Sequence, residues 1–460
     1  MTRRKPVSLL LFGALIFSIC LSCGGNRLNP TVEVEETVRD YLPPDNGSSP
    51  LWCYGSTVIV RLGEKVFLSI PETGADIPPL CNTRWQLNVR DNNGWRVAQY
   101  AQNYRQREPC PLAGFSDGRL FLSVNPSLTP PGTKYLECDP HLLRFSADNP
   151  EAAPGEVRPV WTEQGGAGYF TDHSYRGLGV DGPSGEILLL NIHARQSDQF
   201  WSYRDSDGAW TANGRITFPV RSCYPQVALK NGAGHIMAIG DIIEPVKEWR
   251  EYKYAELKRD WDYVFRSLAY VWTPDITRTG FSKPLEIDNV DSTAGHITNL
   301  DLWIDSDGAA HVLYLKRSIQ YDFLRDKFFP GQPMTTSLEY CVVDKGEVIR
   351  RKTLAVGDED KSGELPGYGR FHTTATGKFY AIYYCGGEDE NGVEISENRI
   401  LRILPETKNA RPVTLDIKDP FRRFFTATER GGSAPSDILD IYGICSERTV
   451  LRYARVTGLD

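Results

Sequence analysis

Seven short runs of apolar residues recur along the chain, and each follows a turn of Gly or polar residues. The runs begin at Lys65, Arg119, Glu186, His235, Ala310, Lys378 and Ile438. Successive starts lie 49 to 75 residues apart. Strand-like units at such a period are typical of a β-propeller, in which each blade is one four-stranded sheet. The pattern predicts an all-β, seven-bladed propeller of four-stranded blades, or six or eight blades if one boundary is misplaced.

The repeats divide the chain into seven predicted blades. They cover residues 54–102, 108–162, 173–218, 223–288, 295–356, 369–418 and 424–457. The last blade holds three strands, and Thr31 to Val38 alternates with strand period without a blade of its own. We expect this N-terminal strand to pair with the last blade and close the ring, which protects an open edge. One propeller would then span residues 31–460.

Long insertions interrupt the repeats between the second and third strands of a blade. The longest, Glu244 to Arg266, is rich in helix formers and aromatic residues, and 317–336 and 386–397 are also long. These hairpin loops share one face with the crossovers between blades, while the other turns emerge on the opposite face. Loop elaboration usually marks the binding face. We therefore expect the functional site on this loop-rich face.

The first 23 residues are predicted to be an export signal. Arg3, Arg4 and Lys5 precede an apolar core from Val7 to Leu21, which ends at Ser22–Cys23–Gly24. A Cys after a small residue at this point resembles the bacterial lipobox, although Cys20 stands where Leu is usual. We expect lipidation of Cys23, a linker over 24–30 and a lipoprotein of the bacterial cell envelope. A plain cleaved signal or an uncleaved anchor is the alternative.

The net charge and the spacing of the cysteines limit the classes of partner and cofactor that we expect. The net charge of −7 shows no basic excess, which argues against nucleic acid. Eight cysteines follow Cys23 without a CxxC pair, so we expect no metal and no cofactor. Exported chains favour disulfides. Because Cys53, Cys81, Cys110 and Cys138 fall on the loop-rich side of the first two blades, at least one pair among them is predicted to bridge.

Polar residues gather at the crossovers and loops of the predicted binding face. Four of the seven histidines and several arginines converge there, namely His173, His193, His296, His372, Arg176, Arg195 and Arg370. A single histidine is most often structural. Convergence on one face favours a site role, above all for His173 and His193 of the third blade.

Part of this set resembles BNR-repeat, sialidase-like propellers, and in particular the ulvan-type polysaccharide lyases of families 24 and 25. In that group a His starts the first strand of a blade, a second His ends the next strand, and a Tyr-Pro opens the following blade. His173, His193 and Tyr224–Pro225 match in order and spacing. The family's following Arg is missing, because Gly240 or Asp241 stands there. Arg176, Arg195 or Arg317 would have to replace it.

The resemblance implies β-elimination on a uronic-acid polysaccharide. Such a lyase removes the proton next to a carboxylate, whose charge must be neutralised first. Tyr224 would act as base or acid, His173 and His193 as base or neutraliser, and Arg176 as the carboxylate clamp. Further substrate contacts are expected from Arg195, His296, Arg370, His372 and Trp249.

Two other functions stay open. The protein is a non-catalytic binder of glycan or protein if aromatic residues of the long insertion stack on sugars, namely Trp249, Tyr252, Tyr254, Trp261 and Tyr263. It is a glycoside hydrolase if two carboxylates among Glu108, Asp172, Asp241 and Asp301 flank a glycosidic bond. In each case we expect a monomer with a polysaccharide or glycan partner and a lipid anchor in the membrane.

Overall fold

The fold was analysed in a computed structural model. It describes residues 28–130, 132–133, 137–162, 170, 176–193, 198–259, 262–407 and 410–460. Seven four-stranded antiparallel sheets form the blades of a propeller, which confirms the predicted fold class. Because each blade packs on the next, the apolar residues of the strands form cores between the blades.

The first four blades follow one another along the chain. The first consists of β2 (Ile59–Leu62), β3 (Lys65–Thr73), β4 (Thr83–Asp91) and β5 (Gly94–Tyr100). The second consists of β6 (Leu112–Gly114), β7 (Arg119–Val124), β8 (His141–Ser146) and β9 (Gly155–Val157). The third consists of β10 (Gly177–Asp181), β11 (Glu186–Ile192), β12 (Asp198–Arg204) and β13 (Trp210–Thr217). The fourth consists of β14 (Ser222–Lys230), β15 (Ala233–Gly240), β18 (Ser267–Thr273) and β19 (Leu285–Asn289).

The last three blades complete the ring. The fifth consists of β20 (His296–Ile304), β21 (Ala310–Arg317), β22 (Thr335–Asp344) and β23 (Glu347–Asp358). The sixth consists of β24 (Gly363–Thr373), β25 (Phe379–Glu388), β26 (Glu394–Leu404) and β27 (Val413–Leu415). The seventh contains β28 (Arg423–Thr426), β29 (Leu439–Ile444) and β30 (Val450–Thr457) from the C-terminal end of the chain and β1 (Thr31–Asp40) from the N-terminal end.

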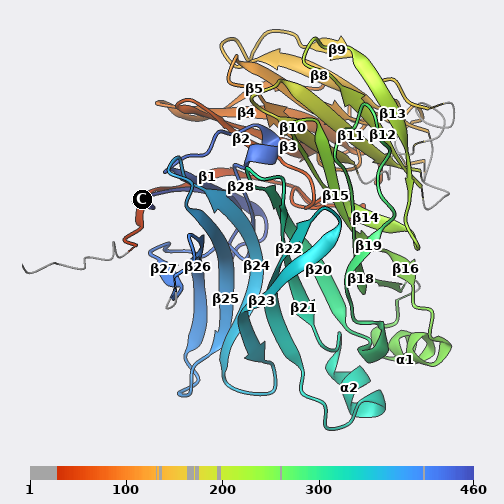
Figure 1. Cartoon of the computed structure of the whole chain (residues 1–460), viewed down its shortest axis with the longest axis vertical. Coiled ribbons are helices and arrows are strands. Elements are labelled where there is room, and N and C mark those ends of the chain that lie inside the picture. The colour runs from red at the N-terminus through yellow and green to blue at the C-terminus, as the bar shows by residue number, and fades with distance from the viewer. Residues whose placement is uncertain are drawn as a thin grey trace, which may run out of the picture.

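The N-terminal strand closes the ring as predicted. β1 runs antiparallel to β30, from Thr31 opposite Thr457 to Asp40 opposite Val450. Figure 1 shows red β1 beside the blue strands at the other end of the chain. Val34 and Val38 of β1 pack against the core between the seventh and first blades. The edge of the seventh blade is thereby covered by the chain itself.

Inner strands are more deeply buried than outer strands, as the third blade shows. β10 is buried at all five residues, but β13 alternates. Glycine allows the inner strands to approach one another closely. A Cβ on Gly179 of β10 would lie 2.7 Å from the carbonyl oxygen of Val227 in β14. A side chain at this position would push two blades apart near the axis.

The long insertion between β15 and β18 forms a separate small layer. It holds β16 (Ile242–Ile243), α1 (Lys247–Leu257) and β17 (Tyr263–Val264), and α2 (Asp322–Phe328) of the fifth blade contributes to the same apolar cluster. Its anchor is a buried ion network, in which Lys253 Nζ lies 2.8 Å from both Glu244 and Asp262 and Arg266 contacts Glu244. No helix within the described residues is long and apolar enough to cross a membrane.

The predicted disulfide is wrong. The eight cysteines of the described chain, including Cys53, Cys81, Cys110 and Cys138, are buried, and no disulfide joins any two of them. Cys53 Sγ lies 3.2 Å from Glu108 Oε2. Burial raises the pKa of the Cys53 thiol well above its ordinary value, and the Glu108 carboxylate adds to the shift. A shared face does not bring two sulfurs within bonding reach.

Candidate functional site

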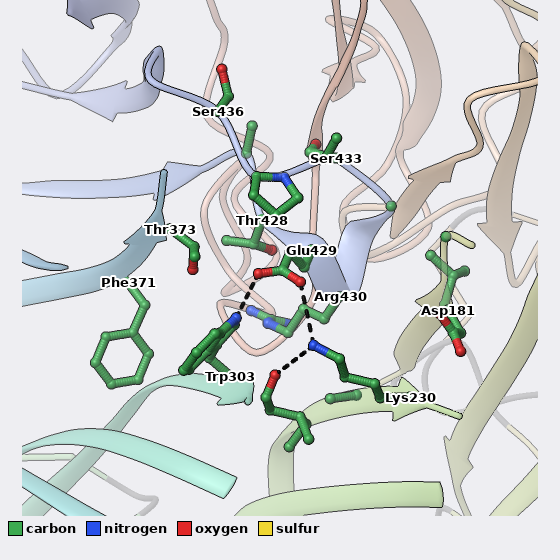
Figure 2. A pocket seen from close by; sticks show the side chains of 18 of the residues that line it. Asp181, Lys230, Trp303, Phe371, Thr373, Thr428, Glu429, Arg430, Ser433 and Ser436 are labelled. Atoms are coloured by element: carbon green, nitrogen blue, oxygen red, sulfur yellow. Dashed lines mark hydrogen bonds and ion pairs between the residues drawn. The ribbon is translucent and has the colours of Figure 1, made fainter. Parts of the chain in front are cut away.

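A cavity of about 370 Å³ lies where the innermost strands of several blades converge. Its wall contains the C-terminal ends of β2, β10, β14, β20 and β24 and the connection between β28 and β29. Figure 2 shows Asp181, Lys230 and Thr373, which end three of these strands. These strand ends lead into the turns between first and second strands. The cavity therefore opens on the face opposite the loop-rich one, where the sequence had placed the site.

One long connection shapes this cavity. The first two strands of most blades are joined by tight turns, but residues 427–438 form a longer loop that contains the 3-10 helix η2 (Glu429–Gly431). Gly432 has φ +90°, and a Cβ there would lie 1.8 Å from the carbonyl oxygen of Gly114 in the second blade. Only glycine allows both the left-handed backbone and this close contact. The loop thus reaches from the seventh blade to the second.

Arg430 anchors the loop at the axis. Its Nε donates to Asp301 Oδ1 of the fifth blade at 3.1 Å, and its Nη1 donates to the carbonyl oxygen of Gly55 at 2.8 Å. Burial lowers the pKa of the Arg430 guanidinium, and the Asp301 carboxylate opposes that shift. A buried ion pair left without one partner is strongly destabilising. The pair therefore holds the loop in one position.

Lys230, Glu429 and Trp303 form the polar centre of the cavity (Figure 2). Trp303 Nε1 donates to Glu429 Oε1 at 2.6 Å, and Lys230 Nζ lies 3.6 Å from Glu429 Oε2. Lys230 Nζ also donates to the carbonyl oxygen of Ile304 at 3.0 Å. The side chains of Lys230 and Glu429 are 28% and 27% exposed, so both charges remain accessible. The group offers a cation, a carboxylate and an aromatic ring to a ligand.

The carboxylates of Asp440 and Asp181 also line the cavity, and each holds two neighbouring blades together. Asp440 accepts two hydrogen bonds of 2.6 Å from the guanidinium of Arg61, which links the seventh blade to the first. Asp181 Oδ2 accepts the backbone N–H of Asn231 at 2.8 Å, which links the third blade to the fourth. These bonds join neighbouring blades beside the axis and fix the spacing of the strands around the cavity.

His372 also lines the cavity. Its Nε2 lies 2.8 Å from the carbonyl oxygen of Ser436. Because a carbonyl only accepts, Nε2 carries the proton, which leaves Nδ1 as an acceptor. This Nδ1 is buried and has no hydrogen-bond partner in the part of the chain that the structure describes. Burial lowers the pKa of His372 to about 4, against weaker opposition from the Ser436 hydrogen bond and Asp440.

The structure places Tyr224 and Arg176, two of the predicted lyase residues, in buried positions. Tyr224 is 5% exposed, stacks on Tyr54 at 4.4 Å between ring centroids, and also contacts Trp52 and Phe265. Arg176 is 2% exposed, and its Nη2 donates to the carbonyl oxygen of Pro109 at 2.9 Å. The ring of Tyr224 and the guanidinium of Arg176 are thus held by different neighbours.

His193 is buried at the end of β11, with its ring 6.1 Å from that of Phe200. His173, Arg195, Trp261, Asp172 and Cys23 lie outside the described residues. The described residues therefore include only part of the predicted lyase site, and the roles given to its residues stay predictions. Lipidation of Cys23 stays a prediction on the same ground.

The other predicted substrate contacts are dispersed. Arg370 is buried and donates to the carbonyl oxygen of Tyr54 at 2.6 Å and to Tyr368 Oη at 2.6 Å. His296 packs against Phe265 at 5.6 Å between ring centroids, and burial lowers its pKa to about 4. Trp249 of α1 packs on Phe329 at 5.5 Å. Of the predicted substrate contacts among the described residues, His372 alone lines the axial cavity.

Sequence reasoning missed Lys230, Glu429, Trp303 and Arg430. One signal was present, because the connection from 427 to 438 is longer than the corresponding turns of the other blades and carries Glu, Arg and two adjacent glycines. The side chains themselves follow ordinary strand and turn patterns. No group of three or more His, Cys, Asp or Glu in the described part of the chain is arranged to hold a metal ion.

Comparison with known proteins supports the fold. No protein-family model matches the chain, and no curated protein matches it in sequence. The structure is similar to the crystal structure of the polysaccharide lyase Uly1, with a TM-score of 0.53 and 10% identity over 94% of this chain and 100% of that chain. An α-L-arabinanase of Penicillium chrysogenum complexed with arabinobiose has a TM-score of 0.41 and 10% identity, over 93% of this chain and 99% of that chain.

Because the His372 ring is buried in its neutral form, we expect the free energy of unfolding to fall at acid pH. A folded pKa near 4 against 6.5 in the unfolded chain favours the neutral ring, so its contribution is complete above pH 6.5 and is lost as the pH falls toward 4. Between pH 7 and 4.5 this amounts to ~2 kcal/mol. We expect His372→Gln to lose less stability than the wild type over this range in urea unfolding. Equal losses in both proteins would contradict the assignment.

Proposed function

We propose that the protein is a glycan-binding propeller whose carbohydrate ligand occupies the axial cavity. The observation that carries the proposal is the group of Lys230, Glu429 and Trp303 inside that cavity. Sugar hydroxyls donate to a carboxylate and accept from an ammonium group, while the C–H face of a sugar packs on an aromatic ring. The cavity volume also falls within the range of small-ligand pockets.

The cavity is built in advance of binding. Trp303 stacks on Phe379 at 4.2 Å between ring centroids, and its indole N–H is held by Glu429. The loop that carries Glu429 is anchored through the adjacent Arg430. Side chains that are already ordered lose little entropy when a ligand arrives. This order favours a binding site over a surface that forms only on contact.

Polysaccharide is the first ligand class to test. The fold neighbour with a TM-score of 0.53 is named as a polysaccharide lyase, and this chain covers all of it. A sugar unit at the end of a chain or in an oligosaccharide fits an axial cavity better than the middle of a long polymer. We therefore propose that short oligosaccharides or chain ends are bound.

Replacing Lys230 by Gln should weaken glycan binding at least about tenfold, because a hydrogen bond to a charged group is lost. Isothermal titration with the oligosaccharide that the wild type binds most tightly in a glycan panel would measure the change. Lys283→Gln removes the same charge at an exposed position outside the cavity and should bind as the wild type does. Equal binding by the wild type and Lys230→Gln would exclude the cavity as the site.

Uronic-acid lyase activity at the loop-rich face is a second candidate, and one observation favours it. Tyr224 has φ +47°, although it is neither glycine nor asparagine and stands in the inner strand β14. Pairing with β15 is irregular there, between Cys223 and Gln226. Backbone strain in a residue of this kind is often retained for function. For substrate to reach the Tyr224 ring, Trp52 and Tyr54 must move away from it.

If this lyase activity exists, Tyr224→Phe should abolish it, because the change removes only the hydroxyl that would transfer the proton. The ring that packs on Tyr54 is kept, so the melting temperature should change little. Ultraviolet absorbance of unsaturated products from a uronic-acid polysaccharide panel gives the measurement. Full activity in this variant would show that Tyr224 takes no part in the mechanism. If the wild type is inactive on every polysaccharide, glycan binding remains as the proposed function.

We also propose that the propeller is exported and held at the membrane through lipid on Cys23, as the N-terminal pattern predicts. Cys23→Ser should lose incorporation of labelled fatty acid when the full chain is expressed in a bacterium. Labelling that is unchanged in this variant would place the lipid elsewhere or show that the signal is of another type.

A further inference from the structure

Three arginines meet where the second and third blades pack together, outside the axial cavity. Arg119 begins β7, Arg144 lies in β8 and Arg204 ends β12. The guanidinium of Arg119 reaches the third blade, because a Cβ on Gly185 would lie 3.0 Å from Arg119 Nη2. The guanidinium of Arg204 reaches the second blade, where it lies over the ring of Phe121 at 5.6 Å. The two side chains therefore cross the same boundary in opposite directions.

The register of the second blade brings Arg144 to this boundary. Arg144 is paired with Phe121 across β7 and β8, so both side chains project from the same side of the sheet. Arg119 stands two residues before Phe121 in β7 and shares that side. The same side packs on the third blade, because Phe121 belongs to a core cluster with Ile187 and Leu189. Arg119 and Arg144 consequently stand on the side of the second blade that the guanidinium of Arg204 reaches.

The guanidinium groups of this cluster have more N–H donors than there are hydrogen-bond acceptors beside them. Nε and Nη1 of Arg204 are buried and have no hydrogen-bond partner among the described residues. Arg119 Nε donates to Asp117 Oδ2 at 2.7 Å, but that carboxylate is 54% exposed. Asp205 follows Arg204 and accepts the backbone N–H of Ala209, and exposed Asp148 lies near Gly118. The acidic groups nearby are thus on turns at the rim rather than between the guanidinium groups.

The pKa of Arg204 agrees with a cluster of like charges. The pKa of the Arg204 guanidinium is lowered, first by burial and then by the charges of Arg119 and Arg144, with Asp205 in opposition. Like charges in contact destabilise a fold unless a counter-ion joins them. Guanidinium groups bind oxyanions through several parallel N–H···O bonds. An anion with several oxygens would relieve the repulsion and use the unpartnered donors.

We propose that Arg119, Arg144 and Arg204 form a binding site for a tetrahedral oxyanion, a sulfate or phosphate group that is free or esterified to a saccharide. The site lies between the outer parts of two blades and does not depend on the function proposed for the axial cavity. Arg144 is exposed, whereas Arg204 is partly buried, so the anion would approach past Arg144 and reach the less exposed Arg204.

The test compares thermal unfolding in sodium sulfate and in sodium chloride at equal ionic strength, with sodium phosphate as a third series. The wild type should be stabilised by sulfate along a saturating curve. Arg144→Gln and Arg204→Gln should need at least about tenfold more sulfate for the same shift, because one charge-assisted contact is lost in each. Arg278→Gln, which removes an exposed charge outside the cluster, should respond as the wild type does.

Two results separate anion binding from a structural role. Without sulfate, Arg144→Gln should be at least as stable as the wild type, because it lowers the repulsion. A loss of stability there would overturn the proposal, as would a linear sulfate effect of equal size in all four proteins, which is the general salting effect. Binding of a sulfated but not an unsulfated oligosaccharide, lost in Arg144→Gln, would identify an ester as the source. Saturation by inorganic sulfate or phosphate alone would identify the free ion.

Discussion

The pairing of β1 with β30 is the constraint on which the rest of this protein depends. A propeller buries the faces of its sheets only when each blade has a neighbour on both sides, and here the last blade is completed by residues from the other end of the chain. Without that strand the outer edge of the seventh blade, at β30, would be left open. Loop-closure entropy must be overcome across more than four hundred residues for this pairing to form. Closure also creates the axis where the cavity lies.

The two ends of the propeller axis differ in how they are filled. Toward the loop-rich face, Tyr54 stacks on Tyr224, and Arg370 donates to the carbonyl oxygen of Tyr54. Toward the opposite face, the connection from 427 to 438 reaches across the axis, and Arg430 holds it against Asp301. The first arrangement covers its end with aromatic rings. The second leaves a chamber, because a loop pinned by one buried ion pair does not fill the space between the strand ends.

This asymmetry has a physical consequence for function. Charges in a chamber walled by protein interact more strongly than charges in water, so the Lys230–Glu429 pair can direct a polar ligand. The buried aromatic end offers shape but little charge to solvent. A propeller of this kind can therefore carry a site at one end of its axis while using residues at the other end for stability. The arginine cluster between the second and third blades adds charge at a third location, away from both ends.

The sequence by itself determined the repeating part of this protein. The number of blades, their strands and the closing role of Thr31–Val38 follow from the two-residue period of strands and from spacing, which are local properties of the chain. Local patterns carry this information because burial of one strand face dictates which positions are apolar.

Only the tertiary structure decided where a ligand can enter. The loop-rich face was the reasonable expectation. The direction of residues 427–438 instead depends on the bond from Arg430 to Asp301, 129 positions away in sequence, and on the close approach of Gly432 to the backbone of Gly114. The same holds for Tyr224, whose burial depends on Trp52 and Tyr54. The predicted disulfide was wrong because a common face fixes direction but not separation. Contacts between distant segments have no period, so no local pattern in the sequence reveals them.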